Sequence, residues 1–388
     1  MLESGVYLWI ILSGIQIVFT VYFLLAYYKV KKISKSVVAS SNPLSFSIII
    51  CGHNEAKHIS HQLLSILNQK MTHPESEVIF VNDRSTDKSN EILQHYQSQF
   101  PRLKVIYIPI DKPRKYQGKK DALMHAFEEA KGEYLILLDA DCAVTHDLWA
   151  EDWVSWMMTH QAAVGLGIGK YEKGKGLLQE FIQFETLNTF MQYGSYAMNN
   201  RAYMGVGRNL VYEKRVIKKA IQDPELITLF QKTIGGDDDM MIHYLKTKDH
   251  LILPYFKEDQ ATISKSPESW KVYFKQKSRH VSVGKHYSQH NQLLLGAYAL
   301  SQALWWVLLS TFVILYILTD TFSTQFVLTI LIFFAIVFNL KFFNYTIWNR
   351  FHSKGQNSFT FVWMELLWLI YHIILAPFIF WKNNKQWK

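Results

Sequence analysis

The stretch Tyr134-Leu-Ile-Leu-Leu-Asp139-Ala-Asp141 decides how the chain folds. An apolar run without alternation is typical of a strand that is buried on both faces of an α/β sheet. Two carboxylates follow where the strand ends, which is the edge at which open α/β sheets bind ligands. Side chains two residues apart on an extended backbone point to the same side. The pair indicates either a cation site or a capped turn, because Asp is also common at turns and helix N-termini.

Strand-like and helix-like segments alternate around this stretch. Repeated βα units of this kind predict a mostly parallel sheet with right-handed crossovers. Residues 177–196 form an aromatic-rich amphipathic helix, which is either a core helix or a helix on a membrane face. Further strands are expected at 45–50, 77–81 and 104–108, and helices at 56–69, 89–96 and 122–130.

The composition points to a membrane protein, since 49% of the residues are hydrophobic, 15% are aromatic and only 19% are charged. Residues 7–28 lack charge and exceed the about 20 residues that a spanning helix needs. A cleaved signal peptide fits less well, because the run is long and no small-residue cleavage site follows. The lysines after it predict an outside N-terminus and a cytosolic domain.

Three more apolar runs close the chain, at 293–318, 326–343 and 359–381. Three crossings would leave the C-terminus outside, yet Lys382, Lys385 and Lys388 favour the cytoplasm. The last run contains Glu365, His372 and Pro377, so a re-entrant or interfacial segment is the alternative to a third crossing. The expected organisation is a transmembrane helix at 1–30, a cytosolic domain at 44–289 and a membrane region at 290–388.

The net charge of +9 fits an anionic membrane surface, an anionic substrate or nucleic acid. No compact basic tract is interleaved with aromatic residues, so nucleic acid is excluded as a partner. Cys51 and Cys142 lack metal-ligand spacing and indicate a reduced, cytosol-facing domain.

Polar residues collect in the loops after four strands. Parallel strands bring their C-terminal ends together, so these loops are expected to be neighbours in space. Carboxylates bind a divalent cation, lysine binds phosphate, and an acid accepts hydrogen bonds from a base or ribose. The combination predicts a site for a nucleotide diphosphate, although each loop alone is explained by capping. The pairs are Asn54/Glu55, Asp83/Asp87, Lys119/Lys120 and Asp139/Asp141.

Two later clusters add to this site. Gly235-Gly236-Asp237-Asp238-Asp239 places three acids together, which raises their pKa values as a general base or metal site requires. An acidic N-cap before a helix at 240–245 explains one acid but not three. Gln276, Arg279 and His280 form a basic patch that faces either lipid headgroups or a diphosphate.

On these motifs the chain resembles the membrane glycosyltransferases of family 2, which include cellulose, chitin and hyaluronan synthases. The resemblance covers residues 44–289 and agrees with the flanking apolar runs. The matching motifs are Ile48-Ile-Ile-Cys-Gly-His-Asn-Glu55, Asn82-Asp-Arg-Ser-Thr-Asp87, Gly118-Lys-Lys-Asp-Ala-Leu123, Asp139-Ala-Asp141, Gly205-Val-Gly-Arg-Asn209, Gly236-Asp-Asp238 and Gln276-Lys-Ser-Arg-His280.

The resemblance implies a GT-A fold (α/β, mostly parallel sheet) and an inverting transfer from a nucleotide sugar, usually a UDP-sugar. The protein is then expected in a bacterial-type plasma membrane with its catalytic domain in the cytosol. The implied roles are nucleoside binding for Glu55 and Asp83, phosphate binding for Lys120, Mg²⁺ or Mn²⁺ binding for Asp139 and Asp141, general base for Asp238 with Asp237 beside it, and pyrophosphate contacts for Gln276 and Arg279.

The chain departs from the family pattern in two places. The last motif usually ends in a tryptophan that stacks on an acceptor sugar, and His280 stands there; Asn82 replaces an aspartate. With the small membrane region, these departures favour single addition to a glycan or lipid over processive polymer synthesis. A nucleotide-sugar-binding protein without catalysis is opposed by Asp238. A transporter is opposed by the scarcity of ionisable residues in the apolar runs.

Overall fold

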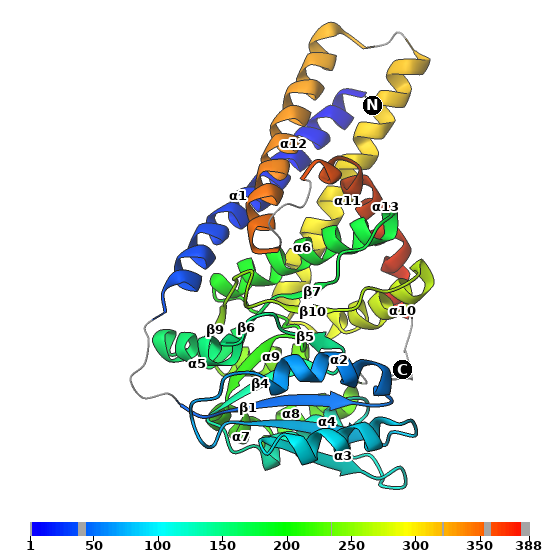
Figure 1. Cartoon of the computed structure of the whole chain (residues 1–388). Coiled ribbons are helices and arrows are strands. Elements are labelled where there is room, and N and C mark those ends of the chain that lie inside the picture. Colours follow the sequence, from blue (N-terminus) through cyan, green and yellow to red (C-terminus); the bar gives the residue numbers. More distant parts are fainter. Residues whose placement is uncertain (1, 38–43, 234, 320–321, 353–357, 382–388) are drawn as a thin grey trace.

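A seven-stranded sheet lies below the long helices in the view of Figure 1. The computed structural model describes residues 2–37, 44–233, 235–319, 322–352 and 358–381. The strand order is β3-β2-β1-β4-β8-β6-β9; β1 is parallel to β2 and β4, β2 to β3 and β6 to β9, whereas β8 is antiparallel to β4 and β6. The strands are β1 (Phe46–Gly52), β2 (Glu77–Asp83), β3 (Leu103–Ile108), β4 (Tyr134–Asp139), β6 (Val164–Leu166), β8 (Leu210–Glu213) and β9 (Ile252–Pro254).

The central strands are apolar without alternation because helices cover both faces of the sheet. β1 and β2 are buried along their whole length, and β4 is buried up to Asp139. Ile48 and Ile50 pack with α2 (Ala56–Leu67), α3 (Ser89–Gln99) and α5 (Trp149–His160), whereas Ile49 packs on the other face with α4 (Lys120–Glu129). The mostly parallel α/β sheet expected from the sequence is confirmed.

A second, three-stranded sheet fixes the turn after β4. Its strands are β5 (Cys142–Ala143), β10 (Thr262–Ser264) and β7 (Gly169–Tyr171). β10 is antiparallel to β5 and parallel to β7. Asp141 therefore lies between two strands, β4 and β5, that belong to different sheets.

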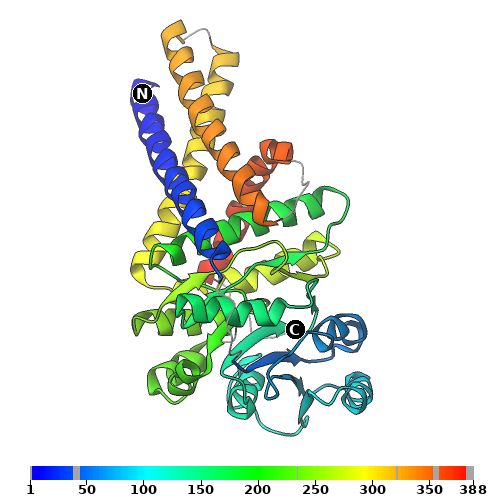
Figure 2. The same cartoon turned by 60° about the vertical axis from the view of Figure 1, so that its left-hand side comes forward.

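The helix α6 (Leu177–Met198) joins the sheet domain to the long helices, and Figure 2 shows it crossing beneath them. Most of its side chains are buried, including all of its phenylalanines. Its rings meet those of the long helices: Phe190 lies 6.2 Å from Trp348, and Tyr196 lies 5.7 Å from Tyr22. The structure thus makes α6 a core helix whose partners include the candidate membrane helices.

Four helices complete the domain around α6. All four contribute buried residues to the same hydrophobic cluster as α6. They are α7 (Lys214–Ala220), α8 (Pro224–Lys232), α9 (Asp237–Thr247) and α10 (Trp270–Val281), followed by the short 3₁₀ helix η1 (Gly284–His286).

Three helices are long and apolar enough to cross a membrane: α1 (Leu2–Lys35), α11 (Gln289–Leu318) and α12 (Thr324–His352). They pack through aromatic and polar contacts. The rings of Trp9 and Trp305 stack at 5.5 Å, Trp9 Nε1 donates to the Trp305 carbonyl at 3.0 Å, and Gln16 Nε2 donates to Ser301 Oγ at 2.7 Å. Such pairs satisfy polar groups that lipid leaves without partners.

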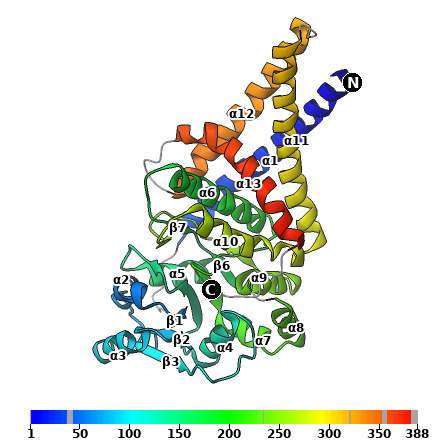
Figure 3. The ribbon, with the colours of Figure 1, turned by 90° about the vertical axis from the view of Figure 1, so that its right-hand side faces the viewer.

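The last apolar run does not continue the hairpin of α11 and α12. After the 3₁₀ helix η2 (Ser358–Thr360), α13 (Phe361–Trp381) turns back and runs beside α10 toward the sheet domain (Figure 3). It is anchored by an ion pair between Lys341 of α12 and Glu365, at 2.5 Å. Lys382, Lys385 and Lys388 lie outside the described residues.

The structure corrects the predicted start of the helix α9. The helix was expected at 240–245 with the acids before it, but it begins at Asp237, so the acids form its first turn. Acidic side chains are favoured there by the helix dipole. Gly236 precedes them with φ of +69°, and a Cβ at this position would come within 2.6 Å of Val283.

Candidate active site

A cavity of about 870 Å³ opens at the C-terminal ends of β1 and β4, below α6 and beside α9 and α10. Its lining includes eight of the ten residues predicted from the sequence. These are Glu55, Asp139, Asp141, Asp237, Asp238, Gln276, Arg279 and His280. The expected convergence of distant loops at one sheet edge is therefore observed, whereas Asp83 and Lys120 are not among the lining residues.

The two acids after β4 are held in different electrostatic environments. Burial would raise the pKa of Asp139, but Lys119, whose Nζ donates to Asp139 Oδ1 at 2.5 Å, holds that pKa below its usual value. Burial and the charge of Asp139 raise the pKa of Asp141. Arg208 and His58 oppose this rise only in part, so the charged form of Asp141 is disfavoured and a cation beside it would stabilise that form.

Of the two adjacent lysines, Lys119 lines the cavity and Lys120 does not. Gly118, with φ of +71°, turns the chain into α4, and Lys119 stands at the helix N-cap. Lys120 is the first helical residue and points away: its Nζ donates to the carbonyls of Thr233 at 2.5 Å and Phe230 at 3.2 Å. Burial lowers the pKa of Lys120 to about 8. The structure thus places Lys120 outside the cavity lining, and its role at phosphate stays a prediction.

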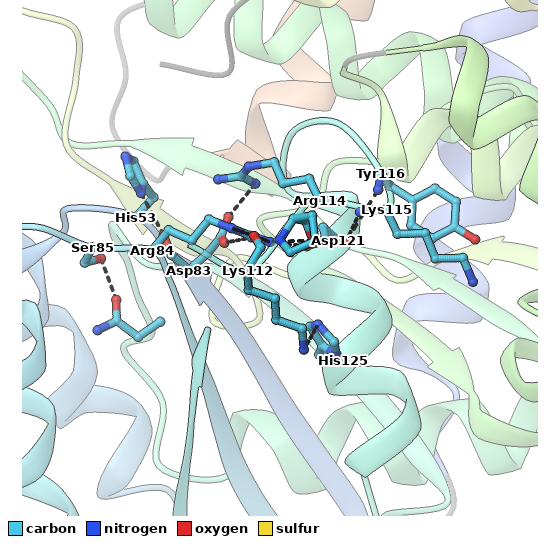
Figure 4. A network of polar contacts seen from close by, with 12 residues as sticks. His53, Asp83, Arg84, Ser85, Lys112, Arg114, Lys115, Tyr116, Asp121 and His125 are labelled. Carbon is cyan, nitrogen blue, oxygen red and sulfur yellow. Dashed lines mark hydrogen bonds and ion pairs between the residues drawn. The ribbon is translucent and has the colours of Figure 1, made fainter. Parts of the chain in front are cut away.

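Asp83 belongs to a buried network at the end of β2 (Figure 4). Its carboxylate accepts from Arg84 and, at 2.7 Å, from Arg114. Arg84 also donates to Asp121 at 2.9 Å, which ties this loop to α4. Two arginines pair with the Asp83 carboxylate, which is not among the cavity-lining residues, and its nucleoside contact stays a prediction.

Glu55 lines the cavity at the end of β1. Its Oε2 lies 2.7 Å from His58 Nδ1, one turn into α2. Its backbone N–H donates to Ser89 Oγ at 3.1 Å, which connects the loops after β1 and β2. His58 thus holds the carboxylate, while the hydrogen bond to Ser89 holds the backbone.

The three acids at the start of α9 have separate partners. Asp238 Oδ2 accepts from the backbone N–H of Gly207 at 2.7 Å, and its side chain lines the cavity beside that of Asp237. Asp239 Oδ2 accepts from the Tyr287 hydroxyl at 2.8 Å, which fastens α9 to the segment before α11. All three acids line the cavity, but the Asp239 carboxylate is bonded to Tyr287, and the catalytic roles of Asp237 and Asp238 stay predictions.

Asp238 has the protonation chemistry of a general base. Burial, together with the charge of Asp237, raises its pKa to about 7, against the partial opposition of the Gly207 hydrogen bond. A base is most effective when its pKa is close to the working pH. The side chain is thus ionised in a large fraction of molecules at neutral pH and holds a proton well once it has accepted one.

Arg208 is a cavity residue that the sequence analysis quoted in a motif without assigning a role. Its guanidinium lies 4.3 Å from the centre of the Tyr171 ring and donates to the Gly169 carbonyl at 3.2 Å. Gln276 of α10 donates to the Tyr171 hydroxyl at 3.0 Å. Position within the glycine-rich motif was the available signal, but the stacking on Tyr171 is a tertiary contact.

Asp139 and Asp141 are two protein carboxylates that could bind a cation in the cavity. Among the described residues, no three His, Cys, Asp or Glu side chains are grouped as a metal site. Asp139 and Asp141 fit a divalent ion that completes its coordination with water and with ligand oxygens, which is the usual state of Mg²⁺ in proteins. The acidic pair fits such an ion because Asp141 lacks a neutralising partner of the kind that Lys119 gives Asp139.

Residues 47–221 match the family model described as Glycosyl transferase family 2. The chain carries a family 2 glycosyltransferase domain. The matched segment includes Glu55, Asp83, Lys119 and the pair Asp139/Asp141. It ends before α9 and α10, so the roles of Asp238 and Arg279 rest on the geometry of the cavity.

The similar proteins are glycosyltransferases. A probable glycosyltransferase, YdaM of Bacillus subtilis, is 26% identical over 238 residues, which are 60% of this chain and 53% of the relative. A poly(ribitol-phosphate) beta-glucosyltransferase of Bacillus spizizenii is 30% identical over 134 residues, or 34% and 20% of the two chains. The chain thus spans about half the length of the first relative and a fifth of the second.

The family 2 domain has the GT-A fold. The mannosyltransferase PcManGT of Pyrobaculum calidifontis, solved in complex with GDP-Man and Mn²⁺, superposes over 99% of this chain and all of its own with a TM-score of 0.57. The sequence identity is 15%, so the likeness is one of fold. It extends beyond the sheet domain to the candidate membrane helices.

Proposed function

We propose that the protein transfers a sugar from a nucleotide sugar, with UDP-sugars as first candidates, to an acceptor hydroxyl with inversion at the anomeric carbon. The observation that carries the proposal is the cavity itself. One enclosed space brings a base, Asp238, together with an acidic pair, Asp139/Asp141, and with the cations Lys119, Arg208 and Arg279. Inverting transfer needs a base for the acceptor and positive charge for the leaving diphosphate.

Asp139 and Asp141 would hold Mg²⁺ or Mn²⁺, and the GDP-Man and Mn²⁺ of PcManGT support a metal of this kind. The ion, when bound, supplies positive charge to the diphosphate. Arg279 and Arg208 stand at the same cavity and offer planar, permanently charged donors to phosphate oxygens. Glu55 is placed to accept hydrogen bonds from the nucleoside.

Side chains of the protein accept the proton that the acceptor hydroxyl loses. Asp238 accepts the acceptor's hydroxyl proton while the hydroxyl oxygen attacks the anomeric carbon from the side opposite to the diphosphate. A single displacement inverts the anomer and needs no covalent sugar–enzyme intermediate. Asp237 keeps the pKa of Asp238 high, and the Gly207 N–H fixes the carboxylate.

The location follows from the helices. α1, α11 and α12 would span a bacterial-type plasma membrane with the N-terminus outside, and the domain at 44–289 would lie in the cytosol. With three spans and α13 turned back to the domain, the C-terminal lysines would also be cytosolic. The arrangement supports a transferase that works at the cytoplasmic membrane face.

The test is donor use by the purified protein. With Mn²⁺ or Mg²⁺, a screen of UDP- and GDP-sugars is expected to give nucleoside diphosphate release from at least one donor. Asp141→Ala should lower release at least about a hundredfold, because the acidic pair loses its second carboxylate. Asp147→Ala is the matched control, an exposed aspartate six residues further along the chain, after β5, that does not line the cavity. Equal activity of the two variants, or no donor hydrolysed at all, would refute the proposal.

A further inference from the structure

The cavity continues past the residues that the donor needs and reaches the long helices. Its far wall consists of Leu295, Gly296 and Ala299 on one face of α11 and of Trp368 and Tyr371 on one face of α13. The spacings of one, three and four residues place each set on a single helix face. One continuous space therefore runs from Asp238 to a gap between two apolar helices.

The α11 wall belongs to a helix that has the length and hydropathy of a membrane span. The same turns carry Leu293 and Leu300, which are 73% and 61% exposed on the outer side of the helix. Exposed leucines about two turns apart on one helix are favoured in contact with lipid chains rather than with water. This end of the cavity thus lies at a level where lipid is the surrounding solvent.

Gly296 leaves a space in this wall. An ideal Cβ built on Gly296 meets no atom within 4 Å. Open space therefore lies beside Gly296 where it lines the cavity, although α11 and α13 are in contact nearby, where the Tyr298 and Trp368 rings lie 6.1 Å apart. A flexible alkyl chain fits such a gap without a change in the backbone.

The other two candidate membrane helices, α1 and α12, offer no second path from the described cavity into the membrane. No residue of α1 or α12 lines the described cavity. Instead these helices pack against α11 through large rings: Trp305 stacks on Trp9 at 5.5 Å and on Phe334 at 5.8 Å. A growing hydrophilic polymer would have to cross this packed bundle, whereas a lipid needs only the gap beside α13.

The presence of a base selects the headgroup. Asp238 lines the cavity, but so do Lys119, Arg208 and Arg279, so charge alone does not exclude an anionic acceptor. A phosphate monoester already carries about −1.5 to −2 charge at neutral pH and needs no base. A neutral hydroxyl must lose a proton to react, so a base beside the acceptor favours a hydroxyl headgroup.

We propose that the acceptor is a membrane lipid with a free, uncharged hydroxyl headgroup, which enters between α11 and α13 and places its hydroxyl beside Asp238. The inference rests on the proposed function and names its acceptor. The acceptor O–H bond breaks and the proton goes to the Asp238 carboxylate. The oxygen forms the new bond to the anomeric carbon, whose bond to the diphosphate breaks with the electron pair on the leaving group. The products are a glycosyl lipid, a nucleoside diphosphate and protonated Asp238.

The experiment uses a nucleotide sugar that the protein hydrolyses. The sugar carries a label, and the fate of that label is measured. The full-length protein in nanodiscs made with a total lipid extract of its native cells is given the labelled nucleotide sugar, and products are partitioned between water and organic solvent. We expect label in the organic phase, in a product stable to mild acid. Label confined to water-soluble product, or a lipid product cleaved by mild acid as a glycosyl phosphate is, would overturn the inference.

Gly296→Leu tests the entry path. The added side chain fits without touching the protein but occupies the gap, so the ratio of lipid transfer to donor hydrolysis should fall at least tenfold. Gly14→Leu is the matched control, because Gly14 is also an exposed helical glycine with nothing within 4 Å of an added Cβ, and it lies on α1 away from the cavity.

The two proposals fail in different ways. Absence of donor hydrolysis in the unmodified protein contradicts the transferase function. Donor hydrolysis with an unchanged transfer ratio in Gly296→Leu contradicts lipid entry between α11 and α13 alone.

Discussion

Asp237, Asp238 and Asp239 show how one residue type takes different roles at adjacent positions. A helical turn points three consecutive side chains in three directions. Asp238 meets the Gly207 N–H and the cavity, whereas Asp239 meets the Tyr287 hydroxyl and holds two elements together. The sequence predicted that acids gather here, but the direction of each depends on where α9 begins, which apolar periodicity does not determine.

The raised pKa of Asp238 predicts a pH-dependent rate. A base must be ionised to accept a proton, so kcat/KM should rise with pH and level off above an apparent pKa of about 7. Well below this pKa the rate should fall roughly tenfold per pH unit. The apparent value belongs to the Asp237/Asp238 pair, since the two charges interact.

Initial rates between pH 5.5 and 8.5, at saturating metal, measure this profile. Asp238→Asn should be inactive across the range, because an amide accepts no proton at these pH values. A rate independent of pH, or an active Asp238→Asn variant, would contradict the assignment of the base.

Lys119 and Lys120 provide a matched pair for a second prediction. Lys119→Met removes the partner of Asp139 inside the cavity, so the KM for the donor should rise about tenfold, the loss of roughly 1.4 kcal/mol of binding. Lys120→Met leaves the Thr233 and Phe230 carbonyls without their donor. It should lower stability by about 1–3 kcal/mol and change the donor KM little.

Donor kinetics and thermal unfolding of the two variants separate these effects. The reverse result, a donor KM raised by Lys120→Met and not by Lys119→Met, would restore the role that the motif implied. The sequence predicted one lysine of this pair at the phosphate, but only the backbone turn at Gly118 decides which.

At the scale of elements, the long central strands could be predicted from the sequence, whereas the short strands beside the site could not. Continuous apolar runs identified β1, β2 and β4 because both faces of the sheet are covered. The short strands β5, β7 and β10 have two or three residues each, too few for a periodic signal. They nevertheless fix the turn that carries Asp141, so the geometry of the acidic pair depends on elements that a single sequence hides.

The helix α13 depends on one buried ion pair. Lys341 Nζ and Glu365 Oε1 are 2.5 Å apart, and Gln302 Nε2 donates to the same oxygen at 3.1 Å. Glu365→Ala leaves the lysine buried without its partner, which should cost about 3–5 kcal/mol. Because α13 forms one wall of the proposed lipid gap, lipid transfer should decline more than donor hydrolysis.

Thermal unfolding in detergent and both activities measure this effect. The double substitution Lys341→Met with Glu365→Leu should recover most of the lost stability, because replacing a buried pair by apolar residues is often neutral or better. A double variant as unstable as Glu365→Ala would show that the packing around position 365, and not the unpaired charge, is decisive.

The whole molecule resolves a conflict that the sequence contains. Three crossings after the domain would place the terminal lysines outside, contrary to the positive-inside rule. Among the described residues after the domain, α11 and α12 are the two helices that meet the length and hydropathy of a membrane span, and α13 turns back beside α10 (Figure 3). Hydropathy could not reveal this, because a helix buried against protein and a helix in lipid are equally apolar.

Cysteine labelling in intact cells tests the resulting topology. The native thiols of Cys51 and Cys142 are buried, and burial raises their pKa values, so they give little background. Ser323→Cys, before α12, should react with a membrane-impermeant maleimide in intact cells. Ser98→Cys, an exposed site on α3, should react only after lysis. Reaction of Ser98→Cys in intact cells would place the catalytic domain outside, where nucleotide sugars are absent, and the proposed donor chemistry would then lack its substrate.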